Sequence, residues 1–156
     1  MVKDHGSSSD CLSSCTRGEL GEYFTDEGNQ IVITGEFLVY VIEDTGYYPA
    51  LISMSNSQFA KAKQWNAMST RLMVDIEGKM ENPALFYTAY ELTSVPQSND
   101  KGSWFGWSIS MKFDAKSGGI IKQLPNGGEI YLAARKLIKD IKDGSVTVKS
   151  EQDDVM

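Results

Sequence analysis

The chain has 156 residues, of which 41% are hydrophobic and 23% are charged, and its formal net charge is −6. This composition is typical of a globular domain and excludes a disordered or collagen-like protein. No stretch approaches the ~18 consecutive apolar residues of a membrane span, and the polar start of the chain lacks the apolar region of a signal peptide. We therefore expect one globular domain in the cytoplasm, either of the producing cell or of an infected host.

The charge is distributed unevenly along the chain. Residues 1–46 contain two basic and nine acidic side chains, a net charge of −7, whereas residues 47–149 contain thirteen basic and nine acidic side chains, a net charge of +4. Residues 150–156 add −3. We interpret this pattern as a flexible acidic leader over 1–28, a single globular domain with a mildly basic body over 29–149, and an acidic tail over 150–156.

The first half of the domain has the sequence of a β-hairpin followed by a helix. Two stretches rich in β-branched and aromatic residues, 31–42 and 49–53, flank the turn-forming segment 43–46 (EDTG). The polar residues at 55–57 offer N-cap side chains for an amphipathic helix that should extend to about Met73.

The second half shows the same order of elements. Residues 84–93 and 104–113 have strand-like sequences on either side of a polar turn at 96–102, and they predict a second hairpin. Residues 126–129 (NGGE) resemble a capping box, so a helix should follow over 128–142.

Two α+β, mostly β architectures explain the order strand, strand, helix, strand, strand, helix. One is an OB-like Greek-key barrel, in which a helix lies between antiparallel strand pairs. Its first strand would have to come from the acidic leader. The other is an open antiparallel sheet of about four to five strands with two helices on one face.

Patterns typical of enzymes and metal sites are absent from the sequence. The one histidine, His5, lies close to the start of the chain, where nothing would hold it for general-base catalysis, and there is no nucleophile elbow or P-loop. Cys11 and Cys15 are the only cysteines, whereas a zinc site needs about four ligands. We expect no enzymatic activity, no metal site and no cofactor.

The segment 99–107 (NDKGSWFGW) is the most informative for function, because it contains three aromatic residues within four positions. Aromatic faces exposed on strands stack on nucleic-acid bases, and nearby lysines and arginines contact the phosphates. Neighbouring residues of a strand point to opposite faces, so part of this cluster must belong to the core. We predict a nucleic-acid-binding surface formed by Trp104, Trp107, Tyr87, Lys61, Lys63, Arg71, Lys101 and Lys112.

Four segments of the chain resemble a family of small proteins encoded by tailed phages. They are 51–58 (LISMSNSQ), 65–66 (WN), 90–93 (YELT) and 99–107, and the similarity extends over roughly 30–144. Some members of this family carry a provisional single-stranded-DNA-binding label. The resemblance implies a phage origin and, through that label, a role in DNA replication or recombination.

The chain departs from this family in two respects. Other members have a longer N-terminal part that contains aromatic residues, whereas this chain has a short acidic leader. A barrel would then be open or would be completed by another subunit. The first helix begins with the segment 59–64 (FAKAKQ), which is less basic than in other members and should make fewer phosphate contacts.

Two hypotheses for the function follow. The first is a phage-type single-stranded-DNA-binding protein that acts in replication or recombination through base stacking and phosphate contacts, with an acidic tail that contacts phage or host replication and recombination proteins. The second is a protein-interaction module, either a virion component or an inhibitor of a host factor, that binds no nucleic acid. Neither involves a membrane. Both allow a homo-oligomer, because an incomplete barrel leaves a strand edge that can pair.

Overall fold

The computed structural model describes residues 10–19 and 21–148. In chain order, the helices and strands are α1 (Asp10–Ser13), β1 (Thr16–Arg17), β2 (Tyr23–Phe24), β3 (Gln30–Ile31), β4 (Thr34–Glu43), β5 (Gly46–Ser55), the 3₁₀ turn η1 (Asn56–Gln58), α2 (Phe59–Thr70), β6 (Val74–Ile76), β7 (Lys79–Glu81), η2 (Leu85–Tyr87), β8 (Ala89–Asn99), β9 (Gly102–Phe113), η3 (Ala115–Ser117), α3 (Gly119–Gln123) and α4 (Gly127–Lys142). Within the described ranges no helix is long and apolar enough to cross a membrane.

The predicted α+β class is confirmed, and the open architecture is the correct one of the two. The strands of the described residues pair antiparallel in four small sheets, and none of these sheets closes into a barrel. The prediction of one sheet with four to five strands was wrong in one respect. Each long hairpin, β4–β5 and β8–β9, forms a separate two-stranded ribbon.

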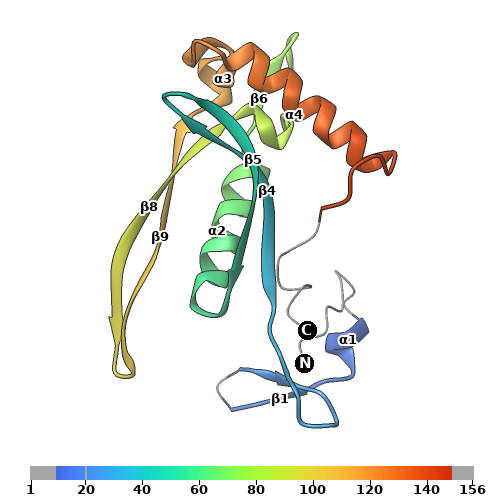
Figure 1. Cartoon of the computed structure of the whole chain (residues 1–156), viewed down its shortest axis with the longest axis vertical. Coiled ribbons are helices and arrows are strands. Elements are labelled where there is room, and N and C mark those ends of the chain that lie inside the picture. Colours follow the sequence, from blue (N-terminus) through green and yellow to red (C-terminus); the bar gives the residue numbers. More distant parts are fainter. Residues whose placement is uncertain (1–9, 20, 149–156) are drawn as a thin grey trace.

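The ribbons remain separate because α2 lies between them (Figure 1). Trp65 of α2 stacks on Phe37 of β4 with ring centroids 4.4 Å apart, and it meets Tyr90 of β8 edge-on at 5.6 Å. Met54 of β5 and Ile109 of β9 are buried in the same cluster. A large indole therefore occupies the space in which the two ribbons would otherwise approach each other, and this is why the predicted OB-like barrel does not form.

At one end of the ribbons, α3 and α4 form a second layer (Figure 1). Ile120 and Ile130 are buried between these helices and the rest of the chain. The predicted capping box at the start of α4 is not formed, because the side chain of Asn126 makes no capping hydrogen bond. The carboxylate of Glu129 instead accepts a hydrogen bond of 2.9 Å from the Tyr47 hydroxyl, which raises the pKa of Tyr47 and ties α4 to β5.

The described part of the predicted flexible leader has regular structure. It contains α1, β1 and β2, and β2 also pairs with β3 just beyond the predicted leader, which gives a three-stranded sheet in the order β1-β2-β3 with positive φ at Gly21 and Gly28. The thiol of Cys15 donates a hydrogen bond of 2.9 Å to the Cys11 carbonyl. Strands of two residues are too short to show a period of two, so the sequence pattern could not reveal them. His5 and the acidic tail at 150–156 lie outside the described residues.

Candidate nucleic-acid interface

The outer half of the β8–β9 ribbon, residues 94–107, extends beyond the core, and we call it the arm (Figure 1). Its strands pair as far as Asn99 and Gly102, so the turn is shorter than the predicted 96–102 segment. Pro96 is accommodated within β8 because each strand of a two-stranded ribbon has a free edge. The side chain of Asn99 accepts a hydrogen bond from the Lys101 backbone N–H at 2.8 Å, which fixes the turn.

Strand alternation decides which rings of the arm share a face. Phe105 and Trp107 are two residues apart and lie on one face, whereas Trp104 lies on the other. Phe105 is 74% exposed and Trp107 is 36% exposed. Trp104 is half-buried, and its indole N–H donates a hydrogen bond of 3.0 Å to Gln97. The predicted pair of Trp104 and Trp107 therefore does not form one stacking surface, and the ring that shares a face with Trp107 is Phe105.

The sequence prediction omitted Phe105, although a signal for it existed. Ile109 is a β-branched apolar residue in the middle of the strand and faces the core at the base of the arm. Residues 105 and 107 have the same parity as Ile109, so they continue its face of the ribbon beyond the point where the core ends. The rings on this face are exposed because α2 does not extend over the whole ribbon (Figure 1).

A glutamine of η1 holds the middle of the arm in place. The Oε1 atom of Gln58 accepts a hydrogen bond of 2.9 Å from the backbone N–H of Trp107, and its Nε2 atom lies 3.4 Å from Oε1 of Gln97. Gly106 is buried beneath this contact, and a Cβ atom there would lie 2.6 Å from the side chains of both glutamines. A side chain at position 106 would therefore displace the ends of these two glutamine side chains from their contact.

We expect the Gln58→Ala substitution to loosen the arm without unfolding the domain. Loss of one hydrogen bond to a backbone N–H costs about 1 kcal/mol, which corresponds to about fivefold faster amide hydrogen exchange at Trp107. Exchange measured by NMR on the intact chain tests this expectation. Gln64→Ala, an exposed position on α2, is the control and should leave the Trp107 amide unchanged. Equal exchange in wild type and Gln58→Ala would show that this contact does not hold the arm.

The tip of the arm and η1 together form a polar hollow of about 330 Å³. Amide, hydroxyl and ammonium groups surround it, and the Trp104 ring forms one side. These groups can hydrogen-bond phosphate oxygens or the edges of bases. The lining residues are Asn56, Ser57, Asn99, Lys101, Gly102, Ser103 and Trp104.

Five of the eight predicted residues lie near the arm and η1. Lys101 is in the turn of the arm, on the same ribbon as Trp104 and Trp107. Lys61 and Lys63 follow Gln58 by three and five residues, which places them about 5–8 Å further along the axis of α2. The ammonium group of Lys63 lies 4.8 Å from the centre of the Phe59 ring.

The other three predicted residues lie away from the arm. Arg71 follows the last residue of α2, about 20 Å from η1 along the helix axis. Lys112 lies at the base of the ribbon, where its ammonium group is 3.7 Å from the Glu91 carboxylate. Tyr87 belongs to η2 and packs edge-on against Tyr131 of α4 at 6.0 Å. The structure therefore does not bring these three residues together with the rings of the arm.

Comparison with known proteins identifies the family of the chain. The family model described as Pam3 phage gp34-like protein matches residues 9–147, which include all of the arm and η1. The chain belongs to this family. The predicted phage origin is thereby confirmed. No curated protein matches the chain, and no solved structure matches it.

The description of the gp34-like family names no ligand, so the ligand has to be inferred from the site. Between positions 94 and 107 the only charged residues are Asp100 and Lys101, both in the turn. Among the described residues, no group of three or more His, Cys, Asp or Glu side chains is placed to hold a metal ion. What the arm offers chemically is two neighbouring aromatic rings, a polar hollow shared with η1, and Lys101, with Lys61 and Lys63 on the adjoining α2.

Proposed function

We propose that this gp34-like protein binds single-stranded DNA through the arm, in replication or recombination of the phage genome in the host cytoplasm, and that it catalyses no reaction on the DNA. The observation that carries the proposal is the exposure of Phe105 beside Trp107 on one face of a ribbon held in place by Gln58. Residues two apart on a strand are separated by about 7 Å, so two bases can stack side by side. Each stacked base contributes about 1–3 kcal/mol.

The chemistry of the arm favours a single strand over a duplex. The faces of bases in a duplex are already stacked on one another, whereas those of a single strand are free to contact aromatic rings. Lys101 lines the polar hollow of the arm, and Lys61 and Lys63 follow η1 on α2, so these three cations are the ones we expect to contact phosphates. With only about three phosphate contacts, most of the affinity has to come from stacking, and the dependence on salt should be shallow.

We expect the Phe105→Ala substitution to weaken binding to a labelled thirty-base oligo-dT by about 5- to 150-fold, the equivalent of one lost stacking contact. Fluorescence anisotropy on folded protein measures this change. Leu132→Ala is the matched control, because Leu132 is an apolar side chain of α4 that is 62% exposed and lies outside the arm. Unchanged affinity in Phe105→Ala would show that DNA does not bind by base stacking on the arm.

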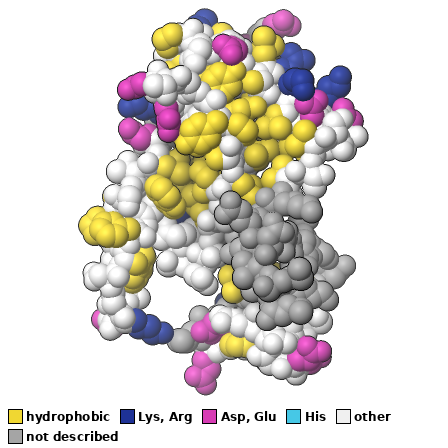
Figure 2. All heavy atoms as spheres, viewed as in Figure 1, with side chains coloured by type: hydrophobic (Ala, Val, Ile, Leu, Met, Phe, Trp, Pro, Cys, Tyr) yellow, Lys and Arg dark blue, Asp and Glu magenta, His cyan; other side chains and the backbone are white. Residues whose placement is uncertain are grey.

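The exposed apolar surface favours a second candidate function, a protein-interaction module such as a virion component or an inhibitor of a host factor. Among the described residues, several large apolar side chains are well exposed, including Met80 at 59%, Leu85 at 63% and Leu132 at 62%. Figure 2 shows apolar side chains across the upper half of one face of the molecule. Surface of this kind is typical of chains that bind another protein or further copies of themselves.

The two candidates predict different behaviour on purification. A protein-interaction module should form a stable complex of defined mass, detected by light scattering after size-exclusion chromatography, and should bind no oligonucleotide. A single-stranded-DNA-binding protein should retain oligonucleotide binding in whatever oligomeric state it has. A homo-oligomer alone would fit both candidates, so the anisotropy measurement decides between them.

A further inference from the structure

A second hollow lies between α4 and η2, and none of the residues that line it belongs to the arm. It has a volume of about 450 Å³, within the range of about 300–1,000 Å³ typical of sites for small ligands. Three cationic side chains, one carboxylate and two apolar side chains surround it. They are Phe86, Arg135, Ile138, Lys139, Lys142 and Asp143.

The three cations of this hollow share one face of α4. Positions 135, 139 and 142 fall within about 60° of each other around a helix with 3.6 residues per turn. Within the part of the chain that the structure describes, none of the three forms an ion pair, whereas Lys136 on an adjacent face pairs with Asp140. The hollow is therefore lined by three cations that form no ion pair with any described side chain.

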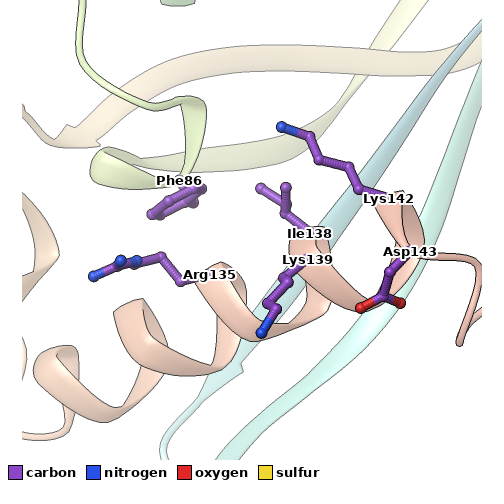
Figure 3. A pocket seen from close by; sticks show the side chains of 6 residues that line it. All are labelled: Phe86, Arg135, Ile138, Lys139, Lys142 and Asp143. Carbon is purple, nitrogen blue, oxygen red and sulfur yellow. The ribbon is translucent and has the colours of Figure 1, made fainter.

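The one acidic residue of the hollow is already hydrogen-bonded elsewhere. The carboxylate of Asp143 accepts hydrogen bonds from the Oγ atom of Ser145 at 2.6 Å and from its backbone N–H at 3.1 Å. These hydrogen bonds lower the pKa of Asp143. In Figure 3 its carboxylate lies at the far end of the hollow from Phe86, so it does not offset the charge of Arg135 beside that ring.

Stabilisation of the helix explains only part of this cluster. Cations in the last turn of a helix interact favourably with its dipole, which accounts for Lys139 and Lys142. Arg135 lies about two turns earlier, where this effect has faded. In Figure 3 the guanidinium group of Arg135 lies on the lower side of Phe86 and the ammonium group of Lys142 lies above Ile138, so the two cations flank the two apolar side chains.

The apolar side chains of the hollow provide a contact surface for a ring. Phe86 is held by Tyr131 of α4, with ring centroids 5.1 Å apart, and Ile138 is 38% exposed. A flat apolar group could lie on these two side chains while an attached anion contacts the cation on one side of them. Guanidinium groups bind phosphate oxygens in pairs of hydrogen bonds, which suits Arg135 to such an anion.

We propose that this hollow binds a nucleoside phosphate, with its base or sugar against Phe86 and Ile138 and its phosphate on one of the two cations that flank them, Arg135 or Lys142. The bound group is either a free mononucleotide or one nucleotide of a strand, because both present a phosphate next to a ring. The site is separate from the arm and does not depend on the function proposed for the arm.

NMR titration of the full chain with AMP, with inorganic phosphate and with the pentanucleotide of thymidine tests the proposal. We expect AMP or the pentanucleotide to shift the amide signals of α4 and η2. The double variant Arg135→Ala/Lys142→Ala should weaken that binding by about tenfold or more, whereas Lys116→Ala, an exposed lysine outside the hollow, should change it less than about twofold. Phe86→Leu keeps this position apolar but removes the aromatic ring. It should therefore weaken the binding of AMP more than the binding of inorganic phosphate.

Each outcome of the titration decides one point. Saturable shifts with AMP identify a free nucleotide as sufficient, and shifts with the pentanucleotide alone identify one unit of a strand. Shifts of the Phe105 and Trp107 amide signals in the same spectra report binding at the arm. Absence of binding at the hollow can therefore be distinguished from absence of binding at the arm. No shift in α4 with any probe would overturn the proposal, and so would a glutamate peptide that binds the hollow as tightly as AMP.

Discussion

Replacing Trp65 with alanine should cost about 3–5 kcal/mol of the free energy of unfolding. Trp65 is 6% exposed and contacts both ribbons, through Phe37 on one side and Tyr90 on the other. The main buried cluster is small, and besides Trp65 it contains only three buried apolar residues among those described, Met54, Ala62 and Ile109. A cavity of indole size at its centre would remove most of the side-chain contacts that join the two hairpins.

Urea denaturation followed by far-UV circular dichroism measures this loss. Total stabilities of single domains are about 5–15 kcal/mol, so Trp65→Ala is expected to be close to unfolded, and Trp65→Phe should fall between it and wild type. The matched control is Trp107→Ala, which removes the same ring from the arm and should cost about 1 kcal/mol or less. Equal losses for the two alanine variants would contradict a core centred on Trp65.

Replacing Gly127 with alanine should destabilise the helical layer by about 1–3 kcal/mol or more. Gly127 is the first residue of α4, and a Cβ atom there would lie 1.8 Å from the Ile120 carbonyl oxygen of α3. The obstacle is backbone, which cannot rotate away as a side chain can. The two helices would have to separate, and this would expose Ile120 and Ile130.

The neighbouring glycine offers a control for this substitution. A Cβ atom at Gly128 would meet nothing within 4 Å, although it lies in the same first turn of α4. Gly128→Ala should therefore be neutral or stabilise the protein by up to about 1 kcal/mol, because alanine is the better helix former. The midpoint of thermal unfolding should thus fall in Gly127→Ala and stay the same or rise in Gly128→Ala. A loss of stability in Gly128→Ala as large as in Gly127→Ala would contradict the packing of α3 on α4.

The regular elements could be predicted from local sequence signals. The segment 43–46 forms the turn between β4 and β5, and α4 spans Gly127–Lys142 against the predicted 128–142. Turn chemistry and apolar periodicity act over a few residues, so the sequence alone reveals them. Helix α2 begins with a 3₁₀ turn and ends at Thr70, a few residues short of the predicted end.

The arrangement of those elements could not be predicted in the same way. A barrel and a pair of separate ribbons have the same local pattern, and the choice depends on Trp65, whose contacts lie 28 and 25 residues away in sequence, at Phe37 and Tyr90. The sheet β1-β2-β3 and the short α3 were missed because each is too brief for its periodicity to be detected.

The candidate site could be predicted only in part, because the exposure of its rings depends on tertiary packing. The composition of the segment 99–107 indicates stacking, but the exposure of each ring depends on where α2 ends alongside the ribbon. Alternation alone separates Trp104 from Trp107, and applying it from Ile109 would have identified Phe105. The position of Tyr87 against α4 depends on tertiary packing that no local pattern records.

The most direct test of single-stranded-DNA binding is fluorescence anisotropy with a labelled thirty-base oligo-dT and with its duplex, over a series of salt concentrations. We expect saturable binding that prefers the single strand. The slope of log K against log salt should be about −2, because about three lysines near the arm contact phosphates. Absence of binding at low salt, in protein shown to be folded, would contradict the account and would favour a protein partner for the exposed apolar surface.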